Sequence, residues 1–497
     1  MNNGKLCISI SAETSEELFE KIVRAEELAD VIEVRFDRLR PEDRITIAER
    51  LSATGKNFLL TFRAPEQGGF RPVSVEERQD FWSTVPNTKW ADVEPDLIED
   101  AERRGFEKLI CSYHASSNTV ANIRQIFALL ADTGADVLKI AAPVETAADS
   151  IPIWNLLNDA SAKGKGLVPI AMGEAGKWTR VLGPANGTFL TFASLETGEE
   201  TAPGQISAVD MRDVFRVKEL DRETEVFGII AKDTSYSISP WMHNAAFKAA
   251  GMNRVFVPLQ TDDVEEFLVR MVRPETREVD LNFHGFSVTN PHKRSIMKFL
   301  DSVDDSATKI GAVNTVKVVN GKLIGHNTDA YGFITPLKKV LGSVKGSRVA
   351  IAGAGGAARA CAYALKQEGA NVSVFARSYK KANALADAIG VKAGAMNNSF
   401  RPGTIDILVN ATPIGTKGEE EEGAIAGSAQ LNGLKLVYDL VYNPLETRLI
   451  REARRAGVPA IGGLDMLLAQ GGRQFEIWTG EKASVDAMKS VALKKLR

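Results

Sequence analysis

The chain of 497 residues is 44% hydrophobic and 25% charged, which is the composition of a globular protein with roughly two to four domains. Its formal net charge of −3 provides no basic field for nucleic acid, and no window approaches the roughly 18 apolar residues of a membrane span. Three scattered cysteines favour a reducing compartment and predict no thiol metal site. The first residues, "MNNGKLCISISAETSEEL", resemble neither a signal nor a transit peptide. We therefore expect a cytoplasmic protein without nucleic-acid or membrane partners; the composition does not indicate an oligomeric state.

The N-terminal part of the chain alternates short apolar runs with helix-like segments. Residues 15–29 and 118–134 have helical periodicity and lie between such runs. This alternation predicts a (β/α)8 barrel of about 200 residues, at the short end of its range, with an open doubly wound sheet as the competing layout. The eight predicted strands are "LCISI", "VIEVRF", "FLLTF", "WADVE", "KLICSYH", "VLKIAA", "VPIAMG" and "TFLTFAS".

Polar residues end most of these apolar runs. In a (β/α)8 barrel the C-terminal ends of the strands meet at one mouth, where the chemistry takes place, so we expect these side chains to converge there. Taken singly, each would more often be a solvated loop charge or a partner in a structural salt bridge. They are Glu33, Arg35, Asp37, Arg63, Glu94, His114, Lys139 and Arg180, followed by the segment "TAPGQ" at 201–205.

Lys139 interrupts the apolar run "DVLKIAAP" at residues 136–143. A lysine among arginines, in a site that limits water, should lose its proton readily, which leaves some amine free to condense with a carbonyl. His114, on the neighbouring predicted strand, should titrate near neutrality and move protons beside the resulting imine. The arginines suit a substrate carboxylate, because a guanidinium pairs with it through two hydrogen bonds.

As an ordered set, the motifs "EVRFDRL", "LLTFR", "ADVE", "CSYH", "VLKIA", "GKWTRVLG" and "TAPGQ" resemble those of type I 3-dehydroquinate dehydratases, over residues 1 to about 215. The resemblance implies that Lys139 forms a Schiff base with the substrate ketone. It implies that His114 removes the adjacent proton and later assists the loss of water, and that Glu94 orients this histidine. It also implies substrate contacts for Glu33, Arg35, Arg63, Arg180, Thr201 and Gln205.

Beyond residue 205 the composition becomes charged and helix-like, and a new apolar strand begins at "VFGIIA", so we place a domain boundary near residue 222. The segment "SRVAIAGAGGAARACAYALKQEGANVSVFARS", residues 347–378, has the pattern of strand, glycine-rich turn, helix and strand that is typical of a dinucleotide site. A single glycine fingerprint is about as often a tight turn as a nucleotide loop. Here Gly353 and Gly355 would let backbone amides and a helix N-terminus approach a pyrophosphate.

The second strand of this unit ends without an acid, whereas an NAD site usually has one there to bind the ribose hydroxyls. The sequence continues from Ala376 with Arg377 and Ser378, and Lys380 and Lys381 follow. Because cations attract the additional phosphate of NADP, this pattern predicts NADP as the cofactor, although an ordinary basic loop would have the same composition.

Turn-rich polar clusters surround this unit, and singly each would be no more than a loop. In order, they resemble the motifs of shikimate dehydrogenases over roughly residues 225–497. The resemblance implies that Lys293 and Asp329 are the acid-base pair beside the substrate carbonyl, although without it both would more often be surface charges. Departures from the family at Tyr236, Asn290 and Ala376 leave the choice between shikimate and quinate open. The clusters are "SYSISPWMHNAAF", "GFSVTNPHK", "GAVNT", "GHNTDAYGF", "NATPIGT", "DLVYNPLETRLI" and "GGLDMLLAQGGRQFEIWTG".

The same resemblance assigns the remaining binding residues. Ser237 and Ser239 would hold the substrate carboxylate, and the other substrate contacts would come from Thr289, Asn314, Tyr442 and Gln470. The residues implied for NADP binding are Gly353, Ala354, Gly355, Gly356, Ala357, Arg377, Ser378, Lys381, Thr412 and Gly463.

The two halves together predict an α/β chain in which a (β/α)8 TIM barrel precedes a two-lobed dehydrogenase module with a Rossmann NADP-binding domain. The expected parts are the barrel (1–222), a substrate-binding domain (223–335), the Rossmann domain (336–461) and C-terminal helices that return to the substrate-binding domain (462–497). The first reaction would produce the substrate of the second, so we expect a bifunctional enzyme acting on small-molecule acids. Two alternatives remain: a metabolite sensor or regulator built from the same domains, and a class I aldolase-like barrel fused to another NADP reductase.

Overall fold

The computed structural model describes residues 4–86, 90–115, 122–395, 403–418 and 420–496. The chain divides into two compact units. The first comprises residues 1–228, 232–236 and 253–283, and the second comprises residues 229–231, 237–252 and 284–497. None of the described helices is long and apolar enough to cross a membrane.

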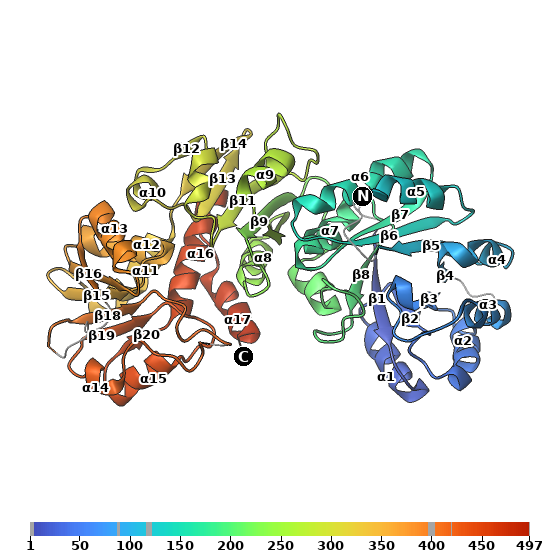
Figure 1. The fold of residues 1–497 in the computed structure, drawn as a ribbon, viewed down its shortest axis with the longest axis horizontal. Helices are drawn as coiled ribbons and strands as arrows, with labels where there is room; N and C mark the ends of the chain where they lie inside the picture. Colours follow the sequence, from blue (N-terminus) through green and yellow to red (C-terminus); the bar gives the residue numbers. More distant parts are fainter. Residues whose placement is uncertain (1–3, 87–89, 116–121, 396–402, 419, 497) are drawn as a thin grey trace. The chain divides into compact units, whose positions relative to one another are not determined.

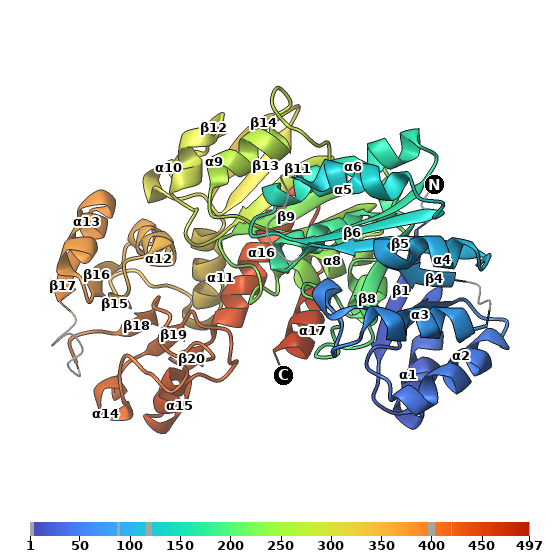
Figure 2. The same cartoon turned by 45° about the vertical axis from the view of Figure 1, so that its right-hand side comes forward.

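The strands of the N-terminal part form a parallel sheet of eight strands among the described residues, in the order β7-β6-β5-β4-β3-β2-β1-β8 (Figures 1 and 2). The first strand therefore lies between the second and the eighth. The backbone N–H of Phe189, just before β8, donates to the carbonyl of Leu167 in β7 at 2.8 Å, so the sheet is nearly closed. The barrel prediction is confirmed over the open sheet. The strands are β1 (Lys5–Ser11), β2 (Val31–Arg35), β3 (Phe58–Thr61), β4 (Trp90–Val93), β5 (Lys108–His114), β6 (Val137–Pro143), β7 (Gly166–Met172) and β8 (Leu190–Ser194).

Helices follow strands β1 to β7 of the barrel, and each of them buries apolar side chains. In the first of them Thr14 accepts the N–H of Glu17 as N-cap, and Leu18, Ile22 and Ala25 form the buried face at helical spacing. Residues 118–121 of the predicted helix at 118–134 lie outside the described residues. The helices are α1 (Ser15–Glu26), α2 (Arg44–Ser52), α3 (Val75–Thr84), α4 (Ile98–Glu102), α5 (Ile123–Ala131), α6 (Ile151–Ala162) and α7 (Lys177–Leu182).

The interior face of the barrel changes from apolar to polar along strands β1 to β6. Because side chains alternate between the two faces of a strand, residues two positions apart point the same way. A buried apolar cluster at the strand beginnings includes Cys7, Val31, Leu59, Trp90, Ile110 and Val137. Two positions further along the same strands lie Ser9, Glu33, Thr61, Asp92, Ser112 and Lys139, all buried. The apolar cluster thus forms a floor beneath a polar layer, and this layer faces the C-terminal ends of the strands.

A second sheet follows the barrel in the chain. Its order is β10-β9-β11-β13-β14-β12, with antiparallel pairing of β11, β13 and β14. Its strands are β9 (Glu225–Ala231), β10 (Arg254–Gln260), β11 (Phe283–Val288), β12 (Ser302–Val303), β13 (Thr315–Val319) and β14 (Lys322–His326). The helices of this part of the chain are α8 (Ser239–Ala249), α9 (Val264–Phe267), α10 (Asp305–Ile310) and α11 (Asp329–Leu341).

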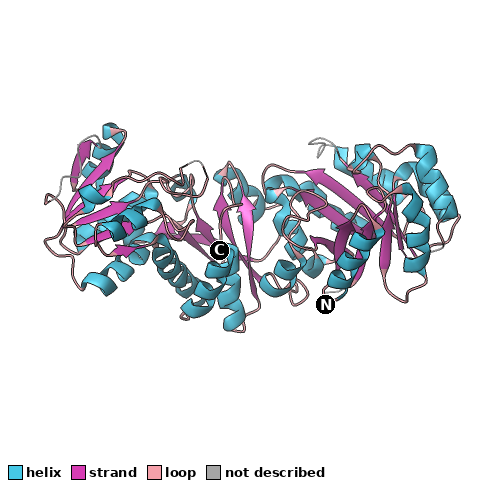
Figure 3. Ribbon diagram, turned by 90° about the horizontal axis from the view of Figure 1, so that it is seen from below, coloured by secondary structure: helices cyan, strands magenta, loops and turns pink. Residues whose placement is uncertain are grey.

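The third sheet is parallel throughout, in the order β17-β16-β15-β18-β19-β20, and it confirms the predicted Rossmann domain. Figure 3 shows its strands flanked by helices. Tyr438 and Phe333 stack in its core, with ring centroids 5.0 Å apart. The strands are β15 (Arg348–Ala352), β16 (Asn371–Ala376), β17 (Lys392–Ala395), β18 (Ile407–Asn410), β19 (Leu436–Asp439) and β20 (Ala460–Ile461). The helices are α12 (Gly356–Gln367), α13 (Tyr379–Ile389), α14 (Ser428–Leu431), α15 (Arg448–Arg455), α16 (Gly463–Thr479) and α17 (Val485–Lys495).

Candidate active sites

Lys139 lies inside the barrel with 4% of its surface exposed. Its Nζ atom is 2.9 Å from Oδ2 of Asp92 and 3.6 Å from Oε1 of Glu33, and it also lies 4.0 Å from the ring centroid of Phe192. Two carboxylates and the face of an aromatic ring all stabilise a positive charge. The sequence predicts arginines around this lysine, but the charged groups nearest to its Nζ atom among the described contacts are two acids.

Asp92 is the centre of a buried network that the sequence did not reveal. Nη2 of Arg63 lies 2.8 Å from the same Oδ2 atom that faces Lys139, and the hydroxyl of Ser112 donates to Oδ1. Burial alone would raise the pKa of Asp92, but the charges of Arg63 and Lys139 lower it well below its ordinary value. The Asp92 carboxylate is therefore ionised throughout the physiological range of pH.

His114 ends β5, on the strand next to Lys139. Burial lowers its pKa well below the ordinary value, and the nearby charges of Arg63 and Lys139 lower it further. The prediction that this histidine titrates near neutrality is therefore wrong, because burial, together with the two cations, keeps the imidazole neutral at pH 7. A neutral imidazole is a proton acceptor, which is the form that a general base requires.

Glu94 does not contact His114 through any hydrogen bond that the structure describes. Its carboxylate accepts from Nη1 of Arg63 at 3.3 Å and from Nη1 of Arg78 at 3.2 Å. Nδ1 of His114 has no hydrogen-bond partner among the described residues, and the backbone N–H of His114 donates to Oε1 of Gln67 at 2.7 Å. These contacts do not support the predicted orienting role of Glu94; they support a role in holding Arg63.

The arginines predicted at the barrel mouth differ in how far their charges are already paired. Arg35 forms a two-bond pair with Asp37, with both N–O distances at 2.9 Å. Arg180 has no acidic partner among the described residues: Nη2 donates to the carbonyl of Pro203, while Nε and Nη1 are buried without a partner. Burial lowers the pKa of Arg180 to about 10, so it remains charged at pH 7. A buried, unpaired guanidinium of this kind is suited to bind an anion.

Thr201 and Gln205 join the loop after β8 to the polar layer. Nε2 of Gln205 donates to the hydroxyl of Thr201 at 3.1 Å, and that hydroxyl donates to Oγ of Ser9 at 2.8 Å. Ser9 in turn donates to Glu33, which also accepts from the hydroxyl of Thr61 at 2.9 Å. A chain of hydrogen bonds therefore runs from the predicted substrate contacts of this loop to an acid beside Lys139.

Lys293 and Asp329 meet in the second unit, as the resemblance implied. Nζ of Lys293 lies 2.6 Å from Oδ2 of Asp329, which is the first residue of α11. A carboxylate is stabilised at a helix N-terminus by the helix dipole. The amide of Asn314 donates to Oδ1 of Asp329 at 2.8 Å, and the N–H of Val313 donates to the carbonyl of Lys293 at 2.7 Å. Three segments far apart in sequence are thereby joined around one ion pair.

Further polar residues hold Asn314 in position. Oε1 of Gln470 accepts from Nδ2 of Asn314 at 3.4 Å, and Nε2 of Gln474 donates to the Asn314 carbonyl at 3.1 Å. Oε1 of Gln474 lies 3.2 Å from Nε2 of His243, whose pKa is lowered by burial to about 4. Gln470 was predicted from the resemblance, whereas Gln474 was not. It lies four residues later on the same face of α16, and this helical spacing is the signal that could have found it.

The other predicted substrate residues of this unit are partly or fully buried. Ser237 and Ser239 lie at the start of α8, where the N–H of Ser239 donates to Oγ of Ser237 at 3.3 Å. Thr289 follows β11, and its N–H donates to the carbonyl of Ile230 at 3.0 Å. Tyr442 lies between β19 and α15 and is half-buried. No contact joins these side chains to Lys293 among those the structure describes, so their substrate roles remain predictions.

A cavity of about 340 Å³ lies at the glycine-rich turn of the Rossmann domain. Gly353 has φ of +121°, a value that L residues rarely adopt, and Gly355 is the N-cap of α12. The cavity has the fit expected for a dinucleotide. Backbone amides and a helix N-terminus face the place of the phosphates, and two basic side chains lie nearby, Arg377 directly after β16 and Lys381 in the first turn of α13. Its lining includes the predicted residues Gly353, Ala354, Gly355, Arg377, Ser378, Lys381 and Thr412, together with Glu420.

The predicted cofactor residues Gly356, Ala357 and Gly463 do not line this cavity. A Cβ atom on Gly356 would lie 3.3 Å from Cδ of Lys293, which places the stem of this lysine beside the first turn of α12. A Cβ atom on Gly463 would collide with the carbonyl of Leu440. These two glycines thus allow close packing, and their predicted contacts with a cofactor remain untested.

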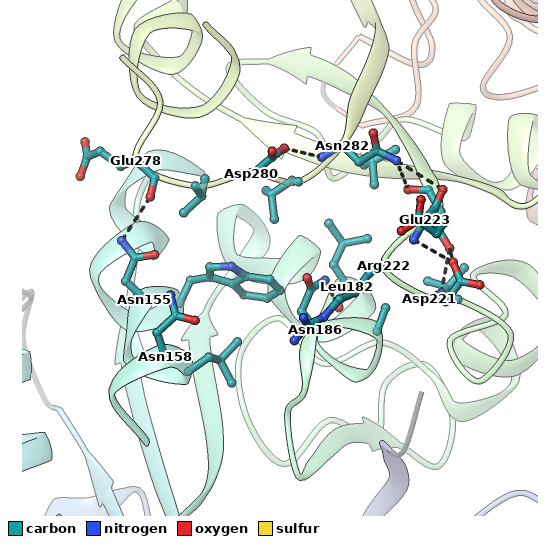
Figure 4. A pocket seen from close by; sticks show the side chains of 18 residues that line it. Asn155, Asn158, Leu182, Asn186, Asp221, Arg222, Glu223, Glu278, Asp280 and Asn282 are labelled. Atoms are coloured by element: carbon teal, nitrogen blue, oxygen red, sulfur yellow. Dashed lines mark hydrogen bonds between the residues drawn. The ribbon is translucent and has the colours of Figure 1, made fainter. Parts of the chain in front are cut away.

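A different cavity, of about 500 Å³, lies in the first unit, and its lining contains none of the predicted site residues. Figure 4 shows its side chains paired with their surroundings: Nδ2 of Asn155 lies 3.5 Å from the carbonyl of Glu278, and Asn282 donates to Asp280 and to the carbonyl of Glu223. Among the residues in the described ranges, no group of three or more His, Cys, Asp or Glu side chains could hold a metal ion.

Four family descriptions match successive parts of the chain. Type I 3-dehydroquinase matches residues 6–222, and the shikimate dehydrogenase substrate binding domain matches residues 229–316. Shikimate / quinate 5-dehydrogenase matches residues 336–414, and the shikimate 5'-dehydrogenase C-terminal domain matches residues 463–493. A bifunctional 3-dehydroquinate dehydratase/shikimate dehydrogenase of Arabidopsis thaliana, described as chloroplastic, is 34% identical over 511 residues, which cover 96% of this chain and 82% of the relative. The chain belongs to this bifunctional family.

Proteins with only the dehydrogenase part of the bifunctional family are also similar. The NADP(+) shikimate dehydrogenase of Methanocaldococcus jannaschii is 40% identical over 288 residues, covering 56% of this chain and 99% of its own. A crystal structure of a shikimate dehydrogenase in complex with NADP+ covers 56% of this chain and 98% of its own, at 39% identity and a TM-score of 0.52. A quinate dehydrogenase from Corynebacterium glutamicum in complex with NAD covers 55% of this chain and 99% of its own, at 30% identity and a TM-score of 0.51.

Proposed function

We propose that the chain dehydrates 3-dehydroquinate to 3-dehydroshikimate in its barrel and reduces that product to shikimate with NADPH in its second half. One arrangement carries the dehydration: the buried amine of Lys139, the neutral imidazole of His114 and the unpaired guanidinium of Arg180 at the ends of barrel strands or in the helix that follows one. A covalent amine, a base and an anion site are what the reaction of a keto acid through an imine needs.

In the barrel, the nitrogen of Lys139 attacks the ketone carbon, and the carbonyl oxygen leaves as water, so that a protonated imine remains. His114 accepts the proton from the carbon next to the imine, because its ring is neutral at pH 7. The same ring then returns that proton to the departing hydroxyl group, which leaves as a second water. The imine is finally hydrolysed, and the amine of Lys139 is restored.

Arg180 binds the substrate carboxylate in this proposal, since it is the predicted arginine whose charge has no acidic partner among the described residues. The hydroxyls of the substrate would meet the hydrogen-bonding groups around the mouth. We assign these contacts to Glu33, Arg35, Arg63, Thr201 and Gln205, the first and last of which are joined by hydrogen bonds through Ser9 and Thr201.

In the second half, Lys293 donates the proton that the carbonyl oxygen of 3-dehydroshikimate gains on reduction. NADPH supplies the hydride when it is bound. Asp329 holds the ammonium of Lys293 at 2.6 Å, and Asn314 holds Asp329, which supports their assignment as the acid-base unit. Ser237 and Ser239 would hold the carboxylate, and Thr289, Asn314, Tyr442 and Gln470 would contact the rest of the substrate.

Arg377 and Lys381 would hold the additional phosphate of NADP, and the glycine-rich turn would hold the pyrophosphate. Their place in the lining of the cavity supports this assignment, together with the absence of an acid at Ala376, where β16 ends. Gly356, Ala357, Thr412 and Gly463 complete the proposed cofactor site.

We further propose the four-part division at residues 1–222, 223–335, 336–461 and 462–497, in the cytoplasm. The buried, free cysteines Cys7, Cys111 and Cys361 are compatible with a reducing compartment. The net charge of −3 supports small-molecule substrates over nucleic acid as partners.

Because both sites are on one chain, each molecule of the intermediate is released near a second site, without a need for a tunnel. Equal coupled rates for the intact chain and its two severed halves would argue against a benefit of fusion.

The dehydratase assignment is tested by trapping the imine. Borohydride reduces an imine to a stable amine, so treatment in the presence of 3-dehydroquinate should add the mass of the reduced adduct to the peptide that contains Lys139. The Lys139→Arg variant should remain unlabelled. Label on another lysine, or no label in a chain that binds 3-dehydroquinate, would contradict the proposal. The second result would favour the metabolite sensor, which no observation in the structure or the comparisons supports at present.

A further inference from the structure

Asp92 places a negative charge directly against the reacting atom of the barrel site. Its side chain is 0% exposed, and Oδ2 lies 2.9 Å from Nζ of Lys139. Glu33 is the other acid near this nitrogen, but its nearer oxygen is 3.6 Å away. Glu33 also accepts hydrogen bonds from Ser9 and Thr61, whereas Oδ2 of Asp92 faces only cations among its described contacts. The electrostatic contact of Asp92 is thus the closer and the more direct of the two.

The orientation of the Asp92 carboxylate is fixed by two further groups. Ser112 donates to Oδ1, and Arg63 lies 2.8 Å from Oδ2. All three side chains are buried, with Asp92 on β4, Ser112 on β5 and Arg63 two residues after the end of β3. A dipole or charge that is already aligned needs no reorganisation when charge develops at the reacting atom, which is the condition for strong electrostatic stabilisation.

We propose that Asp92 is a catalytic residue that acts as the fixed counter-ion of the cationic nitrogen at position 139, before and after the imine forms. This inference rests on the proposed dehydratase function. When the ammonium of Lys139 and a ketone condense, one C–N double bond forms, the C=O bond breaks and one water leaves. The amine gives up a proton to attack the ketone, and one proton is taken up again as water leaves, so the nitrogen is cationic before and after this overall step. A single carboxylate in a fixed position therefore stabilises both the resting amine and the imine.

Arg63 explains why such a counter-ion does not stop the reaction at the imine. When His114 accepts the proton from carbon, the electron pair of the broken C–H bond neutralises the nitrogen, and the positive charge moves to the imidazole. A carboxylate paired with the nitrogen alone would oppose this transfer. Because Oδ2 of Asp92 also faces Nη2 of Arg63, its charge remains compensated when the nitrogen becomes neutral.

The test compares the pH dependence of imine trapping in wild type and in Asp92→Asn, which keeps the size of the side chain and removes its charge. Trapping with cyanoborohydride and 3-dehydroquinate requires the protonated imine. Loss of the counter-ion should move the upper pH limit of trapping down by about 2 units. The rate constant of dehydration, kcat, should fall by about 10²-fold. Reduction of added 3-dehydroshikimate by the same chain should be unchanged, which shows that the second half remains folded.

Asp96→Asn is the matched control. Asp96 lies four residues further along, pairs with Arg78 and has 46% of its side chain exposed, so its loss should leave the trapping profile unchanged. Ser112→Ala provides a second variant in case Asp92→Asn does not fold. It removes the hydrogen bond to Oδ1 but leaves the charge, and it should shift the upper pH limit in the same direction by less than 1 unit, on the order of a few tenths.

Two failures can be told apart. If wild type itself forms no trapped adduct at Lys139, the dehydratase assignment fails, and the role of Asp92 fails with it. If wild type is trapped and both Asp92→Asn and Ser112→Ala keep its pH profile, the counter-ion role is overturned while the dehydratase assignment stands. A fall in kcat without a shift of the profile would also overturn it, because that result indicates only a structural role for Asp92.

Discussion

The lysines of the two candidate sites differ in how deeply they are buried. Lys139 lies within a strand of the barrel, and its side chain and that of its partner Asp92 are 6% and 0% exposed. Lys293 follows a strand, and the side chains of the Lys293 and Asp329 pair are 19% and 7% exposed. In the proposed mechanism Lys139 forms a covalent bond inside the barrel, whereas Lys293 must meet both a substrate and a cofactor. The lysine proposed to form an imine is therefore the more buried of the two, and the lysine proposed to donate a proton is the more exposed.

The charged and polar groups around the two lysines also come from different kinds of structural element. Around Lys139 the charges come from neighbouring strands of one sheet, and each is fixed by at least one other charge or hydroxyl. Around Lys293 the partners come from a helix start and from loops, joined by Asn314. We therefore expect the barrel site to be the more sensitive to single charge changes, and the predictions below test the two sites against each other.

Lys139→Ala should have the largest effect. The nucleophile is lost, so dehydration should fall by at least about 10⁴-fold, while reduction of added 3-dehydroshikimate should stay close to wild type. The two rates are measured separately on one preparation, by the formation of 3-dehydroshikimate and by the consumption of NADPH. Loss of both activities would mean that the lysine is needed for folding and that the comparison between the sites cannot rest on it.

Lys293→Ala should have the opposite pattern. Reduction should fall by about 10² to 10⁴-fold, because the proton donor is lost, while dehydration is preserved. The assay is again NADPH consumption with 3-dehydroshikimate as substrate. Lys338→Ala, at a surface pair with Glu368, is the control and should change neither rate. Near wild-type reduction by Lys293→Ala would refute the assignment of this lysine as the acid.

Arg377→Ala should have a smaller effect that depends on the cofactor. Loss of one charge-assisted hydrogen bond to the additional phosphate should raise KM for NADPH by about 10-fold or more, with little change for NADH, which lacks this phosphate. Lys381→Ala should act in the same direction. KM values for both cofactors are obtained from initial rates at saturating 3-dehydroshikimate. An equal increase in KM for NADH and NADPH would show that the side chain supports the fold of the cavity and does not bind the additional phosphate.

The pH dependence of dehydration should show the smallest change. Burial, Arg63 and Lys139 lower the pKa of His114 well below 6.5, so the base form persists as the pH falls. From pH 7.5 to pH 6 the value of kcat/KM for 3-dehydroquinate should change by less than about twofold, with its acidic limb well below pH 6.5. The corresponding stability contribution is present above pH 6.5 and decreases below it, because the unfolded histidine takes up a proton first. An acidic limb at or above pH 6.5 would contradict the neutral state of His114.

The sequence was sufficient to predict the fold because the barrel and the Rossmann sheet both have strong local signals. The eight strands of the barrel are short apolar runs at regular intervals, and the glycine-rich turn lies between a strand and a helix as expected. The polar side chains at the strand ends also predicted the location of the barrel site, since parallel strands end at one mouth.

The sequence was not sufficient to predict which side chains contact one another in the two sites. Asp92 precedes Glu94 by two residues and faces the same interior, but only the three-dimensional arrangement shows that it, and not Glu94, reaches Lys139. The neutral state of His114 depends on the summed effect of burial and two cations from other strands, which spacing does not reveal. In the second unit, the contact between Lys293 and Asp329 spans 36 positions of the chain and could be inferred only from the resemblance.

The central claim is that both sites act in sequence on one chain, and it is tested most directly by NADPH consumption with 3-dehydroquinate as the only substrate. The purified chain should oxidise NADPH after a short lag, while the Lys139→Ala and Lys293→Ala variants alone should not, and a mixture of the two should restore the signal. Absence of NADPH oxidation by wild type, under conditions in which 3-dehydroquinate binds, would contradict the account of at least one site.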